Sequence, residues 1–166
     1  MTNLYLDVDG VFLLETGDTG LNGRTEYKIA RHTSSVLKWC LQNFECYWLT
    51  ARSCQGSIEE VARAFRFATG STSEIRNLAK SIAVAPWARA KIKGMDLRKP
   101  FVFVDDNIDA IPYQYLLDNG LADKWIHALL THDEDYLLEV VTAPKLVDKA
   151  VRPEALVIPR KKGLPL

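Results

Sequence analysis

The sequence predicts an α/β protein in which a parallel sheet of about five strands lies between two layers of helices. Short apolar runs typical of buried strands alternate along the chain with segments whose apolar residues recur at helical spacing. That alternation is typical of βαβ units, whose strands are parallel. The length of 166 residues suits one domain with its own hydrophobic core.

The first third of the chain is expected to hold two strands, a flap and a helix. A buried strand at residues 3–8 (NLYLDV) ends before Gly10. The glycine-rich segment that follows is too interrupted for a helix, and it predicts a β-hairpin flap over about residues 13–28. Residues 33–43 have apolar positions at helical spacing, and residues 44–50 (FECYWLT) form the second expected strand.

The alternation is expected to continue up to residue 142. A helix is predicted over 57–68, with Ser57 and Glu60 in the spacing of a capping box. Further strands are predicted at 81–85, 100–107 and 124–130, and further helices at 87–95, 109–119 and 133–142. Residues 1–142 would then form a single domain, and the proline-containing segment 143–166 is expected to be an extended tail that packs on it.

Acidic residues and a threonine stand at the ends of three expected strands. The five residues that share this position are Asp7, Asp9, Thr50, Asp105 and Asp106. Because sites in parallel sheets form at the carboxyl ends of the strands, these side chains converge if the first and fourth strands are neighbours. So many carboxylates need a cation nearby, because like charges raise one another's pKa. Oxygen ligands without His or Cys favour Mg²⁺ over zinc.

A magnesium site of this kind suits phosphoryl transfer. Mg²⁺ held by only a few carboxylates keeps open positions that a phosphate can occupy. A carboxylate can also be the nucleophile and form an aspartyl-phosphate. Attack in line with the leaving group requires the charge on the equatorial oxygens to be neutralised, which a metal, a lysine and a hydroxyl donor would achieve.

Three short motifs resemble those of the haloacid dehalogenase (HAD) superfamily. "LYLDVDGV" is similar to the first motif of that superfamily, an apolar strand followed by D-x-D-G-[VT]. "YWLTAR" resembles the second motif, an apolar strand that ends in Thr or Ser. "FVFVDDNID" resembles the fourth motif, an apolar strand followed by two acids. The three motifs occur in this order, each with an expected strand, and span roughly residues 3–110.

The resemblance implies a role for each matching residue in the first two motifs. Asp7 would be the nucleophile and a Mg²⁺ ligand. Asp9 would be the general acid and base, and would offer its main-chain carbonyl to the metal. Thr50 would donate a hydrogen bond to the transferring phosphoryl group. The second acid of the first motif is present in the phosphatases of the superfamily and absent from its dehalogenases, so the chain resembles a phosphatase or phosphotransferase.

The resemblance also implies metal ligands and a lysine. Asp105 would bind Mg²⁺, with Asp106 or Asp109 supporting it directly or through water. The lysine of the third motif is expected to open a short helix about fourteen residues before the metal-binding aspartate. Lys91 is therefore the favoured lysine, and Lys93 is the second choice.

The spacing of the motifs implies that no cap domain covers the site. The 42 residues between Asp7 and Thr50 must hold the flap and a helix, and the 40 between Thr50 and Lys91 must hold helices and a strand. Neither interval has room for a separate folded cap. The chain thus resembles a capless (C0) member with a Rossmann-like three-layer sandwich and strand order 5-4-1-2-3. In that superfamily an open site often goes with large or polymeric substrates.

Composition constrains the partners. The 21 basic and 21 acidic residues cancel, so the net charge gives no support for a nucleic-acid partner, and Arg24, Lys28 and Arg31 near the flap are a local hint only. Arg52 could bind a substrate phosphate, although a merely solvated side chain is the favoured interpretation. No apolar run is long enough to predict a membrane span. The odd number of cysteines and the absence of a secretory signal lead us to expect a cytoplasmic protein.

The expected function is therefore a Mg²⁺-dependent phosphatase that acts on phosphomonoesters through an aspartyl-phosphate. Three alternatives stay open at this point. The first is a module that binds phosphate esters or nucleotides with little turnover, and the second is a phosphatase that processes nucleic-acid ends. The third is a regulatory protein that docks a partner, for which the set of acids would have no use.

Overall fold

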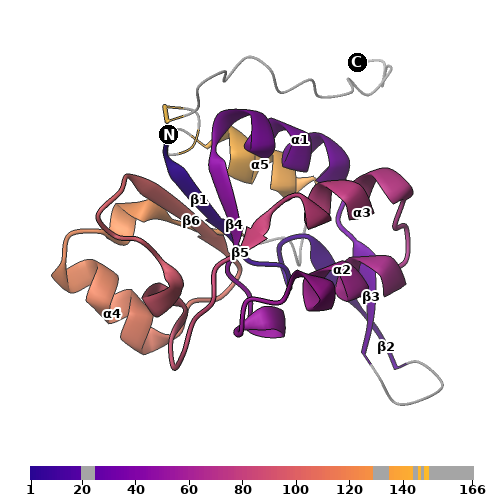
Figure 1. Ribbon diagram of the computed structural model, residues 1–166, viewed down its shortest axis with the longest axis horizontal. Coiled ribbons are helices and arrows are strands. Elements are labelled where there is room, and N and C mark those ends of the chain that lie inside the picture. Colours follow the sequence, from indigo (N-terminus) through magenta and orange to yellow (C-terminus); the bar gives the residue numbers. More distant parts are fainter. Residues whose placement is uncertain (20–24, 129–134, 144–145, 147, 150–166) are drawn as a thin grey trace, which may run out of the picture.

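A five-stranded parallel sheet forms the centre of the protein (Figure 1). The computed structural model describes residues 1–19, 25–128, 135–143, 146 and 148–149. The strands lie in the order β5-β4-β1-β6-β7. Their bounds are Asn3–Leu6 (β1), Glu45–Trp48 (β4), Ala83–Val84 (β5), Phe101–Asp105 (β6) and Trp125–His127 (β7).

The register of the sheet brings the ends of the three central strands level. Leu6 of β1 lies opposite Trp48 of β4 and Val104 of β6. Asp7 follows β1 directly, and its main-chain N–H donates to the Val104 carbonyl at 2.9 Å. Asp105 is the last residue of β6. The carboxyl ends of β1, β4 and β6 therefore meet at one edge of the sheet, where parallel sheets form their sites.

Helices cover both faces of the sheet (Figure 1). Their bounds are Thr33–Asn43 (α1), Ile58–Phe67 (α2), Ser73–Lys80 (α3), Ala110–Asp118 (α4) and Tyr136–Thr142 (α5). Short 3₁₀ turns lie at Ala51–Ser53 (η1), Lys91–Gly94 (η2) and Ala122–Lys124 (η3). Among the residues described, no helix has the length and apolar character needed to cross a membrane.

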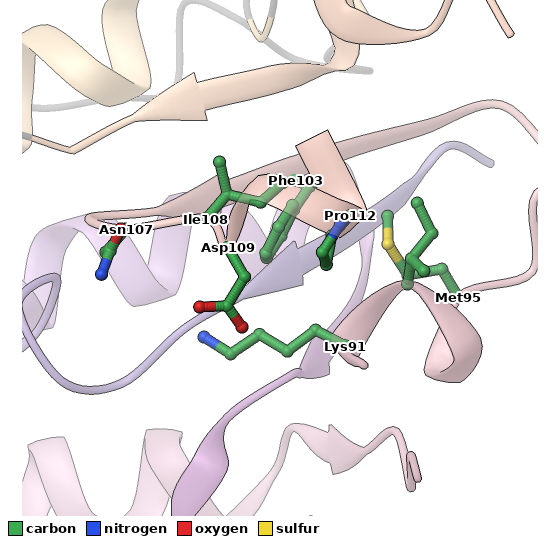
Figure 2. Close-up of a pocket in the computed structure, with 8 residues that line it drawn as sticks. Lys91, Met95, Phe103, Asn107, Ile108, Asp109 and Pro112 are labelled. Atoms are coloured by element: carbon green, nitrogen blue, oxygen red, sulfur yellow. The ribbon is translucent and has the colours of Figure 1, made fainter. Parts of the chain in front are cut away.

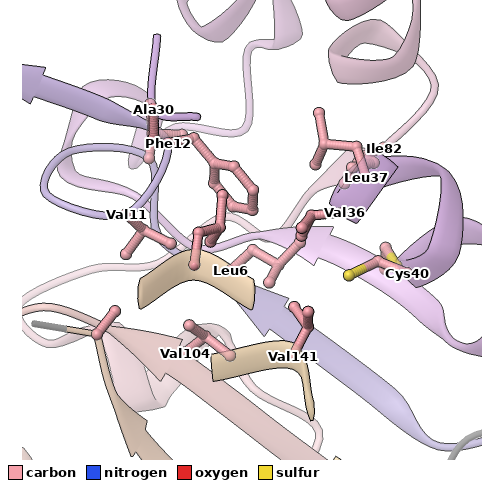
Figure 3. Packing of buried hydrophobic residues seen from close by; sticks show 14 of the residues in the cluster. Leu6, Val11, Phe12, Ala30, Val36, Leu37, Cys40, Ile82, Val104 and Val141 are labelled. Carbon is pink, nitrogen blue, oxygen red and sulfur yellow. The ribbon is translucent and has the colours of Figure 1, made fainter. Parts of the chain in front are cut away.

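Alternation along the strands divides the core in two. Leu6 and Val104 point to one face, where they pack with side chains of α1 such as Val36 and Leu37 (Figure 3). Alternate residues point to the other face, where Phe103 packs with η2 and α4. Because successive side chains of a strand point to opposite faces, strands buried on both sides need the continuous apolar runs seen in the sequence.

An antiparallel hairpin, β2 (Leu13–Thr19) with β3 (Thr25–Ile29), follows the first strand. Its base is fastened to the loop between α2 and α3. The Thr69 N–H donates to the Tyr27 carbonyl at 2.8 Å, and the Ile29 N–H donates to the Thr69 carbonyl at 2.9 Å. The predicted flap is thus a β-hairpin, whose residues 20–24 lie outside the described part of the chain.

Several expectations about the elements were wrong. Helix α3 was not predicted; it is short and polar, and only Ile75 and Ala79 are buried on it. The helix expected at 87–95 is limited to the single 3₁₀ turn η2. Ser57 is the N-cap of α2 but forms no capping bond, because its hydroxyl donates to the Glu59 carboxylate instead. The expected tail falls largely outside the described residues.

Candidate functional site

Three acidic side chains meet at the carboxyl edge of the sheet. Carboxylate oxygens of Asp7, Asp105 and Asp106 all lie within 4.8 Å of one another. Asp7 and Asp105 are buried, and Asp106 is half-buried. One Asp7 oxygen accepts from the Val8 N–H at 2.8 Å, and one Asp105 oxygen accepts from the Asn107 N–H at 2.9 Å. These main-chain donors fix the orientation of both carboxylates.

Lys91 lies between two of these acids. Its ammonium donates to Asp7 Oδ2 at 2.6 Å and to Asp105 Oδ2 at 2.7 Å. Lys91 is the first residue of the η2 turn, and from there its side chain reaches both acids. Lys93, two residues further along the same turn, is exposed instead. The structure therefore brings Lys91, the favoured lysine, to the acids.

The cluster carries more negative charge than Lys91 neutralises. Burial, together with the charge of Asp7, raises the pKa of Asp105 to about 7. Burial and the charge of Asp7 likewise raise the pKa of Asp106. Burial opposes the charged form of Lys91, yet the charges of Asp7 and Asp105 outweigh it and leave the pKa of Lys91 raised. The site thus holds a fixed ammonium beside acids that resist ionising together.

Asp9 is not part of this cluster. Its carboxylate is held by Arg52, whose Nε lies 2.8 and 2.9 Å from the two oxygens and whose Nη2 lies 2.6 Å from Oδ1. The Arg52 guanidinium carbon lies 4.4 Å from the centre of the Tyr27 ring, in a cation–π contact. The favoured interpretation of Arg52 as a solvated side chain was therefore wrong: it connects Asp9 to the hairpin.

Thr50 is fully buried just beyond β4. Its hydroxyl accepts from the Arg52 N–H at 3.3 Å, and its carbonyl accepts from the indole N–H of Trp87 at 3.1 Å. Because the hydroxyl accepts a main-chain bond, its own proton is available for donation.

Gly10 makes room for one of the acids. Its φ of +70° is in the left-handed region, and a Cβ added there would lie 2.0 Å from Asp106 Oδ2. Only glycine fits this close approach, so the D-x-D-G pattern has a steric reason in this protein. His127 of β7 holds the main chain at Asp106, because its Nε2 donates to the Asp106 carbonyl at 2.7 Å.

No protein-family model, curated protein or solved structure matches this chain. The functional argument therefore depends on the geometry of the chain's own residues. The likeness of the motifs to the HAD superfamily stays a prediction.

The remaining candidates lie around the cluster. Asp109 is exposed and borders a pocket of about 320 Å³, including the part open to solvent, together with Lys91 (Figure 2). Its walls are otherwise mostly apolar and come from η2, β6 and the start of α4; they include Ile92, Met95, Phe103 and Pro112. Of the basic residues near the flap, Arg24 lies outside the described residues, and Arg31 pairs with Asp135 at 3.3 Å.

Sequence reasoning missed Tyr27 and Trp87. Tyr27 falls within the predicted flap and Trp87 within the helix predicted at 87–95, and neither pattern indicates a contact with a site residue. A partial signal existed for Tyr27, since an aromatic ring in a flap over a charged site is well placed to contact a cation. No such signal existed for Trp87, because its contact with the Thr50 carbonyl depends on the path of the loop before η2.

Proposed function

We propose that this protein is a Mg²⁺-dependent phosphatase that hydrolyses phosphomonoesters through an aspartyl-phosphate on Asp7. The observation that carries the proposal is the meeting of Asp7, Lys91 and Asp105 at the carboxyl edge of the sheet. Asp7 is buried and is oriented by a main-chain donor, which suits a carboxylate nucleophile. The ammonium of Lys91 supplies positive charge where a phosphoryl group would arrive.

The acids fit a divalent cation. Three carboxylates and one ammonium leave two negative charges, and burial makes that excess costly, as the raised pKa of Asp105 indicates. Asp7, Asp105 and Asp106 offer oxygen ligands alone, which suits a hard cation such as Mg²⁺. The main-chain carbonyl of Asp9 is a further proposed ligand. When bound, Mg²⁺ would neutralise charge on the transferring phosphoryl group.

The reaction assigned to these residues has two steps. An oxygen of Asp7 attacks phosphorus while the ester bond breaks, and Asp9 gives a proton to the departing oxygen. Asp9 then takes a proton from water, whose oxygen attacks the aspartyl-phosphate, releasing inorganic phosphate and restoring Asp7. The Thr50 hydroxyl and Lys91 stabilise the charge on the phosphoryl oxygens in both steps.

The fold supports an open site of the kind expected for a capless HAD member. When the five strands of the sheet are numbered along the chain, their order β7-β6-β1-β4-β5 reads 5-4-1-2-3. Between β1 and β4 the described residues form a hairpin and one helix, and between β4 and β6 they form short helices, turns and β5. We propose that the hairpin alone covers the site, which would admit a large phosphorylated substrate.

A second candidate is a module that binds phosphate esters but turns them over slowly. It is favoured by the ion pair of Asp9 with Arg52, because a carboxylate that receives three short guanidinium contacts is poorly placed to donate a proton. Such a module would bind phosphate esters in a Mg²⁺-dependent way without releasing phosphate.

Hydrolysis of an aryl phosphate tests both candidates. The wild-type protein is expected to release the phenol with Mg²⁺ and to stop when the metal is chelated. Asp7→Asn should abolish the reaction while circular dichroism stays unchanged, whereas Asp118→Asn, at the exposed end of α4, should have no effect. Intact mass spectrometry after acid quenching should find one phosphoryl group on the wild type and none on Asp7→Asn. Mg²⁺-dependent binding without turnover would select the second candidate.

A further inference from the structure

We propose that Arg52 and Tyr27 form a subsite for a second anionic group, carried by the leaving group of the phosphate ester. This inference rests on the proposed phosphatase function and names the class of substrate that the site selects. The preferred substrates would be phosphomonoesters with a carboxylate or a further phosphate a few bonds away from the ester oxygen.

The position of Arg52 relative to Asp9 places its guanidinium on the side of the proposed leaving group. The proton that Asp9 supplies goes to the ester oxygen, so the carboxylate faces the leaving group. Arg52 lies directly against that carboxylate, with contacts of 2.6 to 2.9 Å. Lys91, by contrast, is held between Asp7 and Asp105, on the side of the transferring phosphoryl group. The two cations therefore serve different ends of the ester.

Asp9 does not use all the N–H donors of Arg52. Asp9 uses Nε and Nη2, and Nη1 has no hydrogen-bond partner among the residues that the structure describes. The side chain of Arg52 is 26% exposed, and that of Asp9 is 37% exposed. A guanidinium presents five N–H donors in a planar fork, so it can hold Asp9 on one edge and an anion on another.

Tyr27 provides a fixed platform for the guanidinium. Its carbonyl accepts from the Thr69 N–H at 2.8 Å, and two residues later Ile29 donates back to Thr69 at 2.9 Å. Thr69 therefore holds one edge of β3, and Tyr27 lies opposite Glu15 of β2 on the other edge. The ring, at 4.4 Å from Arg52, limits the planes that the guanidinium can adopt. A preorganised donor loses less entropy when it binds an anion.

The expected interaction energies indicate that Arg52 contributes more to anion binding than to folding stability. An ion pair as exposed as that of Arg52 with Asp9 adds little to folding stability, because water screens it. A hydrogen bond from a guanidinium to an anion in a partly dry site is stronger than a neutral one. The gain from Arg52 is therefore expected mainly when an anion binds.

A matched pair of substrates tests the subsite. 3-Carboxyphenyl phosphate and 3-carbamoylphenyl phosphate have nearly the same shape and differ in charge. For the wild-type protein with Mg²⁺, kcat/KM is expected to be about tenfold higher for the carboxylate. Arg52→Ala should remove this preference and Arg52→Lys should keep part of it. Tyr27→Phe should keep the preference and Tyr27→Leu should reduce it. Arg63→Ala, an exposed arginine of α2, should leave it unchanged.

Binding provides a readout that does not need turnover. Calorimetry of both esters with the Asp7→Asn protein and Mg²⁺ should show the same preference, and a second Arg52→Ala substitution should abolish it. Equal affinities for the two esters would overturn the subsite even if hydrolysis proceeds. An equal loss for both esters in Arg52→Ala would also overturn it, since Arg52 would then act only through Asp9. Selective binding of the carboxylate ester, combined with no hydrolysis by the wild-type protein, would contradict the phosphatase function but would still support the subsite.

Discussion

Lys91 donates a 2.6 Å hydrogen bond to Asp7, which precedes it by 84 residues. The same ammonium lies 2.7 Å from Asp105, 14 residues further along the chain. One cation thus joins the η2 turn to the ends of the neighbouring strands β1 and β6. Both the stability of the metal-free protein and its proposed chemistry are expected to depend on this contact.

Replacing Lys91 by Met is expected to destabilise the metal-free protein. The change leaves two buried carboxylates without their common cation, at a cost of roughly 3–5 kcal/mol. Urea unfolding without metal measures this loss, and Mg²⁺ should restore part of it by taking over the positive charge. Lys93→Met is the matched control, because Lys93 is exposed on the same turn. Equal stability of the two variants would contradict the role of Lys91.

The stabilising effect of Mg²⁺ is expected to grow with pH. The pKa of Asp105 is raised to about 7 in the folded, metal-free protein, by burial and by Asp7. Because the folded pKa exceeds the unfolded value of about 4, the protonated form favours folding at low pH, and this contribution is lost as pH rises through about 7. Mg²⁺ would replace the lost proton.

Thermal unfolding at about pH 6 and about pH 8, with and without Mg²⁺, measures this effect. The rise in Tm caused by Mg²⁺ should be larger at the higher pH. Asp105→Asn should remove most of the difference, since the amide neither titrates nor carries charge. A Mg²⁺ effect of the same size at both pH values would contradict the link between protonation of Asp105 and metal binding.

Gly10→Ala is expected to disturb Asp106. The new Cβ would overlap the Asp106 carboxylate, at 2.0 Å from Oδ2, so the acid must move and Mg²⁺ affinity should fall. Gly120→Ala separates this clash from backbone strain, because Gly120 has a similar φ of +65° and no atom within 4 Å of its added Cβ. Both variants should lose about 1 kcal/mol of stability from strain. Calorimetric Mg²⁺ titration should be weakened in Gly10→Ala alone.

Thr50→Val is expected to lower kcat for an aryl phosphate by about a hundredfold, because it removes one donor to the phosphoryl group. Thr50→Ser keeps the hydroxyl and should keep most of the activity. Since Thr50 is fully buried, unfolding curves must accompany the kinetics. A Val variant that is less stable but equally active per folded molecule would assign Thr50 a structural role only.

The sequence sufficed to place Asp7 and Asp105 because they follow directly from the strands, whereas Asp9, which was expected to converge with them, pairs with Arg52 instead. Asp7 and Asp105 stand at the ends of continuous apolar runs, and the parallel register carries both to one edge. Such positions are local in sequence and fixed by main-chain pairing. Lys91 was harder to choose, since a single 3₁₀ turn and a long side chain decide where the ammonium lies.

Other features had a weak local signal or none. Ile75, Leu78 and Ala79 recur at helical spacing in α3, but the helix has only eight residues, so this pattern is too short to stand out. The helix is also held by the Trp48 indole, which donates to the Ala79 carbonyl at 2.8 Å. The contact of Arg52 with Asp9 spans 43 residues and joins the η1 turn to the segment that follows β1. Loop geometry of this kind depends on the assembled fold, which a pattern of apolar residues does not encode.

Because Thr69 is bonded to the base of the hairpin, the residues proposed to select the substrate are positioned by different segments from the residues proposed to react with it. Residues at the ends of β1, β4 and β6 are fixed by the sheet itself, so the positions of the reacting groups can change little. Tyr27, through Thr69, depends instead on the length and path of the loop that joins α2 to α3. If Arg52 and Tyr27 select the substrate, insertions or deletions in that loop would change the molecules that are accepted and leave the chemical step intact. New specificities could then evolve from a segment that never touches the substrate.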